Sequence, residues 1–397
     1  MVRVIRRRFG KIDHPLDRYS EIVDDLTHDI LRGHYLPSDR LPRWRELTAR
    51  YDTTLATVRK ALDRLDKYGF IERSGWHGIR VAANPPNRCH FGLIFPDYGD
   101  ATGQFPSRFL TTLAHAAGEL RNTRPRWLSV YPGVRGESDE DLRQLAADLN
   151  ARRLAGLILT DRHTAENARL AALLRTAQVP VAALLAVVKL PGITRVIFPP
   201  TDFLNRACAY LRAQGRRRVA LVSVAHLGPM MWDLAQAPLA AHGLISHPWW
   251  RADAALQCPG ALRPAMQMLW RLPAADRPDA MVITDDNMVT EATAGLAEAG
   301  VRVPQDLAVV AHANFPLQTV SALPAVRLGV DVRRVLATCL DVLEQRGRGV
   351  VIPEPVIIPA EFASEIQARG AAQPATKKLP IHTSENYSAQ LGGGGPQ

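Results

Sequence analysis

Basic and hydroxyl side chains gather between residues 43 and 64, in a pattern that suits a polyanion. In the stretch 57–65 the apolar residues share one helical face, which leaves Thr57, Arg59, Lys60 and Arg64 on the opposite face. A helix that presents such groups fits the major groove of a duplex and can reach phosphates and base edges. The segment therefore predicts a nucleic-acid contact. For each charge the alternative is a solvated basic surface.

These side chains need a scaffold, which the first ninety residues predict. A helix is expected over residues 22–30, a second over 44–51 and a third over 58–65, with Thr53 and Thr54 as candidate N-caps. Two short strands are expected at 70–73 and 79–81, joined by a turn at 74–78. Three helices followed by a hairpin are the layout of a winged helix-turn-helix, an α+β unit.

Several segments of this region resemble those of a known protein family. The segments 30–37 (ILRGHYLP), 41–47 (LPRWREL), 57–62 (TVRKAL) and 69–71 (GFI) are similar to the DNA-binding domain of GntR-type regulators, over residues 15–82. The resemblance implies that Arg45, Thr57, Arg59 and Gly78 approach DNA. The predicted contact set is completed by three further residues, Arg43, Thr54 and Lys60.

Two positions depart from that family. Arg43 stands where the family often has serine, which adds a phosphate contact. Leu55 stands where the family often has arginine, which removes a base reader. The resemblance therefore implies double-stranded DNA as a partner, at an operator that differs from the family's usual one.

Charge and composition agree with this prediction and exclude other classes. Residues 1–88 contain 18 Lys and Arg against 12 Asp and Glu, and so carry +6 of the net charge of +10. No apolar run approaches the ~20 residues that span a bilayer, so no membrane partner is predicted and the expected location is cytoplasmic. The four cysteines are far apart and form no C-x-x-C pair; we interpret them as buried free thiols.

After a proline-containing connector the pattern changes. We predict a DNA-binding domain over residues 1–83, a short, stiff linker at 84–89, a two-lobed domain at 90–366 and a disordered tail at 367–397. Within 90–366, short apolar runs alternate with amphipathic stretches of helical length, which predicts an α/β fold with parallel sheets.

A second resemblance covers roughly residues 90–365. The block 277–310, together with 153–159 and 211–222, is similar to the ligand-binding domain of LacI-type regulators, which shares its fold with periplasmic sugar-binding proteins. The resemblance implies two α/β lobes joined by three crossovers, with a small molecule in the cleft between them.

Clefts of this kind lie at the carboxyl ends of the strands. Asp97, Asp161, Ser223 and Asp286 follow or end predicted strands, and Trp232 could stack on a ligand, so these five are the candidate effector contacts. The resemblance implies that Asp286 holds ligand hydroxyls. The alternatives are that Asp285 or Asp286 caps the next helix and that Trp232 is a core residue.

Several polar anchors of the sugar-binding members are absent. Met231 takes the place of an arginine, Pro199 or Pro200 that of an aspartate, and residues 311–314 read AHAN. These departures weaken the case for a sugar ligand.

Together the patterns predict a DNA-binding transcription regulator, a repressor, that a small molecule controls. It is expected to act as a homodimer, without a cofactor or metal. The alternative is a regulator whose sensor-like domain has lost its ligand and serves dimerisation or protein contact. An enzyme is not expected, because the chain lacks the G-x-x-x-x-G-K-[ST], H-E-x-x-H and G-x-S-x-G motifs.

Overall fold

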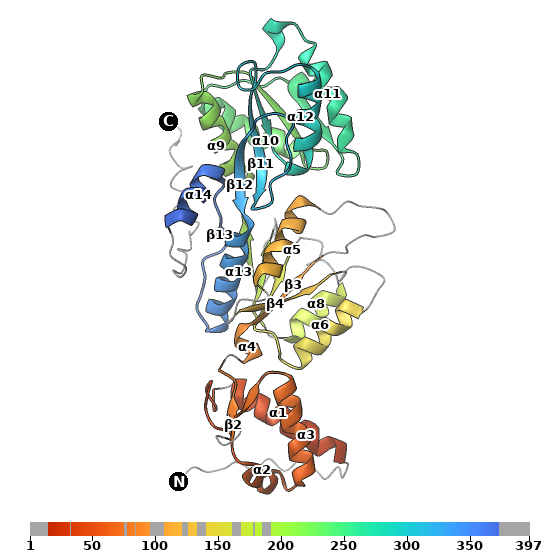
Figure 1. Ribbon diagram of the computed structural model, residues 1–397, viewed down its shortest axis with the longest axis vertical. Coiled ribbons are helices and arrows are strands. Elements are labelled where there is room, and N and C mark those ends of the chain that lie inside the picture. The colour runs from red at the N-terminus through yellow and green to blue at the C-terminus, as the bar shows by residue number, and fades with distance from the viewer. Residues whose placement is uncertain are drawn as a thin grey trace, which may run out of the picture.

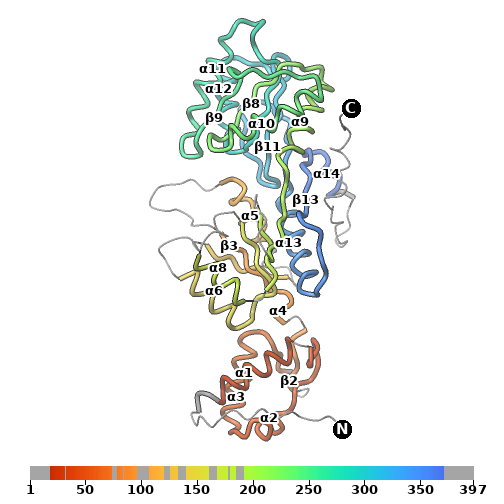
Figure 2. Tube along the Cα trace, turned by 180° about the vertical axis from the view of Figure 1, so that it is seen from behind, coloured from red at the N-terminus to blue at the C-terminus, as the bar shows by residue number. Residues whose placement is uncertain are grey.

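The computed structural model describes residues 15–31, 33–74, 78–83, 85–95, 107–120, 126–132, 140–160, 168–177, 179–184 and 192–372. Three bodies follow one another along the long axis of the molecule (Figure 1). The N-terminal helical body lies at one end, and two α/β bodies, here called lobe 1 and lobe 2, follow it. The view from behind gives the same order (Figure 2).

The N-terminal body is the predicted winged helix-turn-helix. Its elements are α1 (Pro15–Leu31), α2 (Trp44–Tyr51), α3 (Leu55–Lys67), β1 (Ile71–Ser74) and β2 (Gly78–Val81). The two strands pair antiparallel, with Ile71 opposite Val81. Apolar residues of all five elements share one core, because each helix has a single apolar face to bury.

The segment between this body and lobe 1 contains a helical turn. It is α4 (Pro86–Cys89), and β3 (His90–Ile94) begins at the next residue. The sequence predicts a short, stiff linker at 84–89; residues 86–89 of this segment are helical, which its prolines alone did not indicate. Pro86 at the helix start supplies a fixed φ where no N–H donor is needed.

Lobe 1 is a parallel sheet with helices on both faces. Its strand order is β13-β7-β6-β5-β3-β4, and neighbouring strands within the described residues pair parallel. Helices α5 (Arg108–Leu120) and α13 (Val332–Gly347) cover one face, and α6 (Glu140–Asn150) and α8 (Ala168–Ala177) cover the other. The remaining strands are β4 (Trp127–Tyr131), β5 (Gly156–Leu159), β6 (Val181–Leu184), β7 (Ile193–Ile197) and β13 (Val356–Ile357).

Lobe 2 repeats this design with strand order β14-β12-β11-β10-β8-β9. Among the described strand pairs of this sheet, only the pair that the edge strand β14 forms with β12 is antiparallel. Helices α9 (Pro200–Ala213) and α10 (Gly228–Ala241) pack on one face, and α11 (Leu262–Trp270) and α12 (Val289–Glu298) on the other. Its strands are β8 (Val219–Val224), β9 (Arg251–Ala254), β10 (Ala280–Ile283), β11 (Ala308–Phe315), β12 (Val326–Asp331) and β14 (Glu361–Phe362).

The chain passes between the lobes three times. It leaves lobe 1 after β7, returns to it after β12 through α13, and leaves again between β13 and β14. The predicted α/β class, with parallel sheets behind a winged helix-turn-helix, is thus confirmed.

Two details differ from the sequence predictions. Helix α14 (Ala363–Ala372) runs past Gln367, where the disordered tail was predicted to begin, and Arg369 anchors it by pairing with Asp331 and Glu361. Residues 373–397 lie outside the described part. Cys258 is exposed, so the interpretation of all four cysteines as buried thiols is wrong for that one. Among the described helices, none is both long enough and apolar enough to cross a bilayer.

A pair of glycines tests the packing of these helices. A Cβ added at Gly295 in α12 would overlap the backbone oxygen of Arg263 in α11, whereas one added at Gly118 in α5 would meet nothing within 4 Å. We expect Gly295→Ala to destabilise the protein by about 1–3 kcal/mol, because backbone cannot yield as a side-chain tip can. Gly118→Ala should be neutral or stabilising, since alanine is the better helix former. Differential scanning calorimetry of both variants would check this, and equal melting temperatures would contradict it.

Candidate functional site

Helix α3 separates its core residues from its basic ones. Val58, Ala61, Leu62 and Leu65 are buried against α1 and α2, and the exposed side includes Arg59 and Lys60. The helical period of 3.6 residues fixes this division, because four apolar residues on one stripe leave the basic ones outside.

The start of α3 is an exposed, capped helix terminus. Thr54 is the N-cap; its Oγ1 accepts a hydrogen bond from the Thr57 backbone N–H at 3.3 Å. The two threonine hydroxyls lie 3.0 Å apart. Thr54 and Leu55 are exposed, Leu55 by 47% of its surface. The positive end of the helix dipole and two hydroxyls thus lie together with an apolar side chain, an arrangement that suits phosphate and base contacts.

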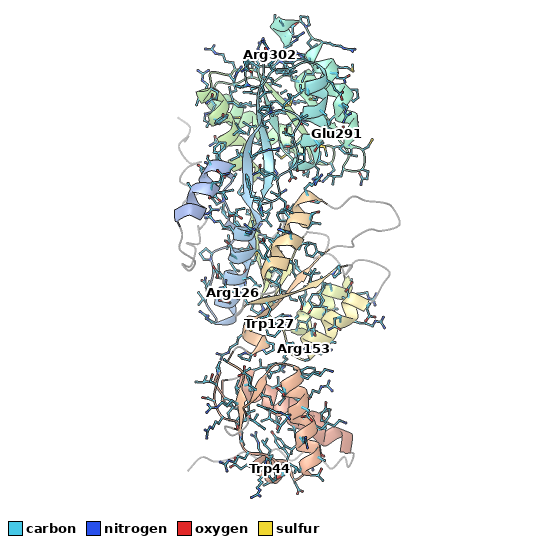
Figure 3. All side chains as sticks on the ribbon, in the orientation of Figure 1. Trp44, Arg126, Trp127, Arg153, Glu291 and Arg302 are labelled. Atoms are coloured by element: carbon cyan, nitrogen blue, oxygen red, sulfur yellow. The ribbon has the colours of Figure 1, made fainter. Side chains whose placement is uncertain are left out.

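Helix α2 supplies the two other predicted arginines. Arg43 is at the N-cap position, and its backbone N–H donates to Glu46 Oε2 at 3.1 Å. The Arg45 guanidinium lies 5.0 Å from the centre of the Trp44 ring, a cation–π contact. Both arginines are exposed. Trp44 marks the end of the molecule that is farthest from lobe 2 (Figure 3).

Two predicted residues have more specific surroundings than the sequence indicates. The Lys60 ammonium lies 5.0 Å from the Tyr19 ring of α1, so it leans toward α1 rather than away from the domain. Gly78 begins β2 with a φ of +80°, which favours glycine, and an added Cβ there would meet no atom of the described residues within 4 Å. Residues 75–77 of the wing turn are outside the described part.

In the predicted cleft, Asp286 is the best-defined candidate. It is 2% exposed and follows β10 at the start of the short helix η5 (Asp286–Met288). Its Oδ2 accepts a hydrogen bond from Asn314 Nδ2 at 2.8 Å. Burial raises the pKa of Asp286 above the usual carboxyl range, and the nearby His312 and Asn314 oppose this shift only in part. A carboxyl group so placed is a candidate ligand contact.

The two roles considered for Asp285 and Asp286, helix cap and ligand contact, fall on different residues. The Asp285 side chain accepts from the Asn287 backbone N–H at 2.9 Å, so Asp285 is the helix cap. Asp286 is therefore not needed as the helix cap. Asn287 in turn crosses between the lobes, because its Oδ1 accepts from the Arg108 backbone N–H of α5 at 3.2 Å. Asp286 therefore lies next to a point where lobe 2 touches lobe 1.

The other candidates fall into three groups. Asp97 and Asp161 lie outside the described residues. Ser223 is 1% exposed in β8, and its hydroxyl has no hydrogen-bond partner within the described chain. Trp232 of α10 lies under the Arg251 guanidinium at 5.7 Å, and its buried Nε1 likewise lacks a partner there. Met231, which replaces the family's arginine, is a core residue at 6% exposure.

Sequence reasoning missed a polar group around Asp286. Arg327 donates from Nη2 to the Thr319 carbonyl at 2.6 Å, while its Nη1 is buried with no partner among the described residues. Burial lowers the pKa of Arg327, and the Asp286 carboxylate opposes the shift. Asn314 Oδ1, His312 Nδ1 and Thr319 Oγ1 are also buried and unpartnered in that part. The sequence marks residues 311–314 only as a stretch that departs from the family's polar anchors, and the group itself forms only through the pairing of β10, β11 and β12.

Family comparisons agree with this division of the chain. Residues 18–81 match the model of the bacterial regulatory proteins of the gntR family, and residues 208–362 match that of the periplasmic binding protein-like domain. A regulatory protein of the LacI family from Chloroflexus aggregans has a similar fold, with a TM-score of 0.53 at 17% identity over 69% of this chain and 96% of that one.

Curated relatives match over shorter stretches. The probable transcriptional regulator PhnF of Escherichia coli (strain K12) is 37% identical over 68 residues, which are 17% of this chain and 28% of that protein. The HTH-type transcriptional repressor PurR of Aliivibrio salmonicida (strain LFI1238) is 27% identical over 108 residues, 27% of this chain and 32% of that protein. The chain thus spans about a third of the length of these relatives. Its N-terminal part thus matches a GntR-type DNA-binding domain and its C-terminal part a periplasmic-binding-protein-like domain. The LacI-family structure from Chloroflexus aggregans shares the fold of the second part.

Proposed function

We propose that the protein is a transcriptional repressor whose operator affinity is controlled by a small molecule bound between lobes 1 and 2. The observation that carries this proposal is the exposed surface formed by Arg45, Arg59 and the capped start of α3. A helix terminus supplies N–H donors to a phosphate, and arginine reads guanine or phosphate. The repressor assignment is supported by the similarity to the HTH-type transcriptional repressor PurR of Aliivibrio salmonicida.

The polar group around Asp286 supports the effector half of the proposal. A buried carboxyl group and a buried guanidinium with a free N–H both cost folding free energy, and such a cost is expected where a ligand must be bound. Asp286 can accept hydroxyl hydrogens, while Arg327 Nη1 can donate to an anionic oxygen. These residues favour a polar ligand with both hydroxyl and anionic groups over a neutral sugar.

A dimer follows from the same logic. One winged helix covers a single half-site, and two copies related by a twofold axis would read a palindrome. A ligand that binds the closed lobes more tightly than the open ones would change the spacing of the two reading helices.

Selection from a pool of random duplexes tests the DNA-binding half. We expect a recurring palindromic sequence, bound about 10³-fold or more tightly than random DNA at physiological salt. Titration with selected and scrambled duplexes at several salt concentrations would measure the ratio. Equal affinity for both would refute a sequence-specific regulator.

A second candidate function is a regulator without an effector. The burial of Met231 in the core favours it, because this position then offers no polar anchor to the cleft. Thermal-shift screening across sugars, sugar acids, nucleosides and amino acids separates the two candidates. A reproducible rise of the melting temperature with any of these compounds would exclude the effector-free reading.

The role of the α3 arginine can be measured directly. We expect Arg59→Gln to weaken binding to the selected duplex and to reduce the slope of log affinity against log salt by about 1, since one phosphate or base contact is lost. Lys67→Gln is the matched control, because Lys67 is exposed at the opposite end of the same helix. Its affinity should stay within about two-fold of wild type; an equal loss in both variants would mean that only overall charge matters.

Leu55 offers a test of sequence reading. Its exposed side chain at the first position of α3 suits contact with a thymine methyl group. Leu55→Arg should move the selected sequence from thymine toward guanine at one position of each half-site. Repeating the duplex selection with this variant checks the change, and an unaltered consensus would show that Leu55 faces no base.

Asp286→Asn separates stability from ligand binding. The Asp286 carboxyl has a higher pKa in the folded state than in the unfolded state. As the pH rises from the unfolded-state pKa to the folded-state pKa, this group makes the folded protein less stable. The Asn variant lacks the titrating group, so it should be more stable than wild type at neutral pH. We expect a gain of roughly 2–4 °C in melting temperature at pH 7.5 that shrinks toward about pH 4. The same variant should lose any ligand-induced shift. A lower melting temperature with intact ligand response would contradict both expectations.

A further inference from the structure

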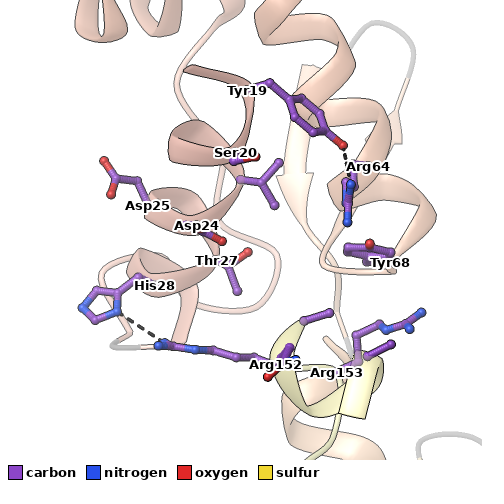
Figure 4. A pocket seen from close by; sticks show the side chains of 14 residues that line it. Tyr19, Ser20, Asp24, Asp25, Thr27, His28, Arg64, Tyr68, Arg152 and Arg153 are labelled. Carbon is purple, nitrogen blue, oxygen red and sulfur yellow. Dashed lines mark hydrogen bonds between the residues drawn. The ribbon is translucent and has the colours of Figure 1, made fainter. Parts of the chain in front are cut away.

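Lobe 1 touches the far end of the α3 helix directly. Tyr68 is the C-cap of α3, and the Arg153 guanidinium of lobe 1 lies 4.8 Å from the centre of its ring. Arg64 of α3 lies 5.1 Å from the same ring. The Tyr68 ring therefore has one guanidinium from its own helix and one from the neighbouring body, and Figure 4 shows Tyr68 between Arg64 and Arg153.

Arg153 is held in place by the core of lobe 1. It forms an ion pair with Asp148, a residue of α6 that is only 5% exposed. Asp148 also accepts hydrogen bonds from Tyr131 Oη at 2.6 Å and from Gln144 Nε2 at 3.2 Å. A side chain anchored through a buried carboxylate loses little further entropy when it makes an outward contact.

A second contact lies beside the first, on the same turn. Arg152 has a φ of +51°, a left-handed conformation uncommon for arginine, and its Nη1 lies 3.4 Å from His28 Nδ1 of α1. The backbone N–H groups of Arg152 and Arg153 close the turn on Leu149 and Asp148 carbonyls, at 2.9 Å each. Lobe 1 thus presents two successive arginines to two different helices of the winged helix-turn-helix (Figure 4).

An open groove of about 780 Å³ separates the two bodies around these contacts. Asp24 and Asp25 of α1 line the wall on the helix-turn-helix side together with the basic Arg64, and Arg152 and Arg153 line the other wall. Among the described residues, the Arg153–Tyr68 and Arg152–His28 contacts lie along this groove and join the two bodies. Small contacts of this kind can be broken by a modest rotation.

The linker reaches the same end of α3. Gly69 has a φ of +75°, and a Cβ added there would lie 3.4 Å from Cγ of Pro86 in α4. One residue after α4 ends, the His90 carbonyl accepts from the Ala155 N–H of lobe 1 at 2.6 Å. The Tyr68–Gly69 turn is therefore contacted by both the linker and the Arg152–Arg153 turn.

We propose that the Arg152–Arg153 turn of lobe 1 is a docking surface for the C-terminal end of α3. It fixes the orientation of the winged helix-turn-helix on the sensor, so that a movement of lobe 1 turns the opposite, exposed end of α3. The surface acts through the Tyr68 ring and needs no contact with DNA or with a ligand.

Distances between spin labels in the full chain test this proposal without DNA or effector. Labels at Glu72→Cys and Ala172→Cys, with Cys258→Ser, report the orientation of the two bodies, since both sites and the native thiol are exposed. In this background Tyr68→Leu and Arg153→Gln should each broaden the distance distribution about two-fold or more.

Two controls match those variants. Tyr68→Phe keeps the ring and should keep the reference distribution. Arg175→Gln removes an exposed arginine of α8 away from the groove and should also leave the distribution unchanged. Because Arg153→Gln could disturb lobe 1 through Asp148, Tyr68→Leu is the decisive variant. A natively folded Tyr68→Leu protein with the reference distribution would overturn the proposal.

A functional readout rests on the proposed function, whereas the distance measurement does not. With duplexes from the selection, Tyr68→Leu should weaken binding to a two-half-site duplex about tenfold and leave single half-site binding within about two-fold. An equal loss on both duplexes would assign Tyr68 to the folding of α3 and contradict docking. If the wild type binds no selected duplex, the proposed function fails while the spin-label result stands.

Discussion

Parallel strand pairing is the constraint on which the rest of the two-lobed domain depends. Parallel neighbours need a crossover between them, so helices cover both faces of each sheet and the strands read as apolar runs. The carboxyl ends of the strands then gather at one edge. The three passages between the sheets bring such an edge of lobe 2 to lobe 1, where Asn287 meets the start of α5. Asp286 owes its position to this geometry.

In lobe 2, the burial of charged groups around Asp286 lowers the free energy of unfolding. Asp286 is almost inaccessible and Arg327 keeps a buried N–H without a partner in the described chain. Replacing such groups with apolar ones is often neutral or stabilising, so their presence calls for a reason other than folding. Binding of a polar ligand is such a reason, and it is consistent with the capping role having fallen to Asp285.

At the other end of the sensor, a buried carboxylate positions an exposed contact. Asp148 accepts hydrogen bonds from Tyr131 and Gln144 and forms an ion pair with Arg153. Arg153 in turn contacts the Tyr68 ring of the helix-turn-helix body. Helix α6, which carries Asp148, packs on the lobe 1 sheet. The end of α3 is thus connected to the lobe 1 core through side chains as well as through the linker.

The sequence by itself determined the winged helix-turn-helix, the alternating α/β sensor and the exposed arginines of α2 and α3, because helical and strand periodicity are local properties. Tertiary structure alone decided which aspartate caps, that Met231 enters the core, that Lys60 leans on Tyr19 and that α14 continues past Gln367. Arg327, Asn314 and the Arg153–Tyr68 contact were likewise unpredictable. Each of these features depends on residues that are distant in sequence. The packing and hydrogen-bond energies that bring such residues together arise only when the strands and domains pack.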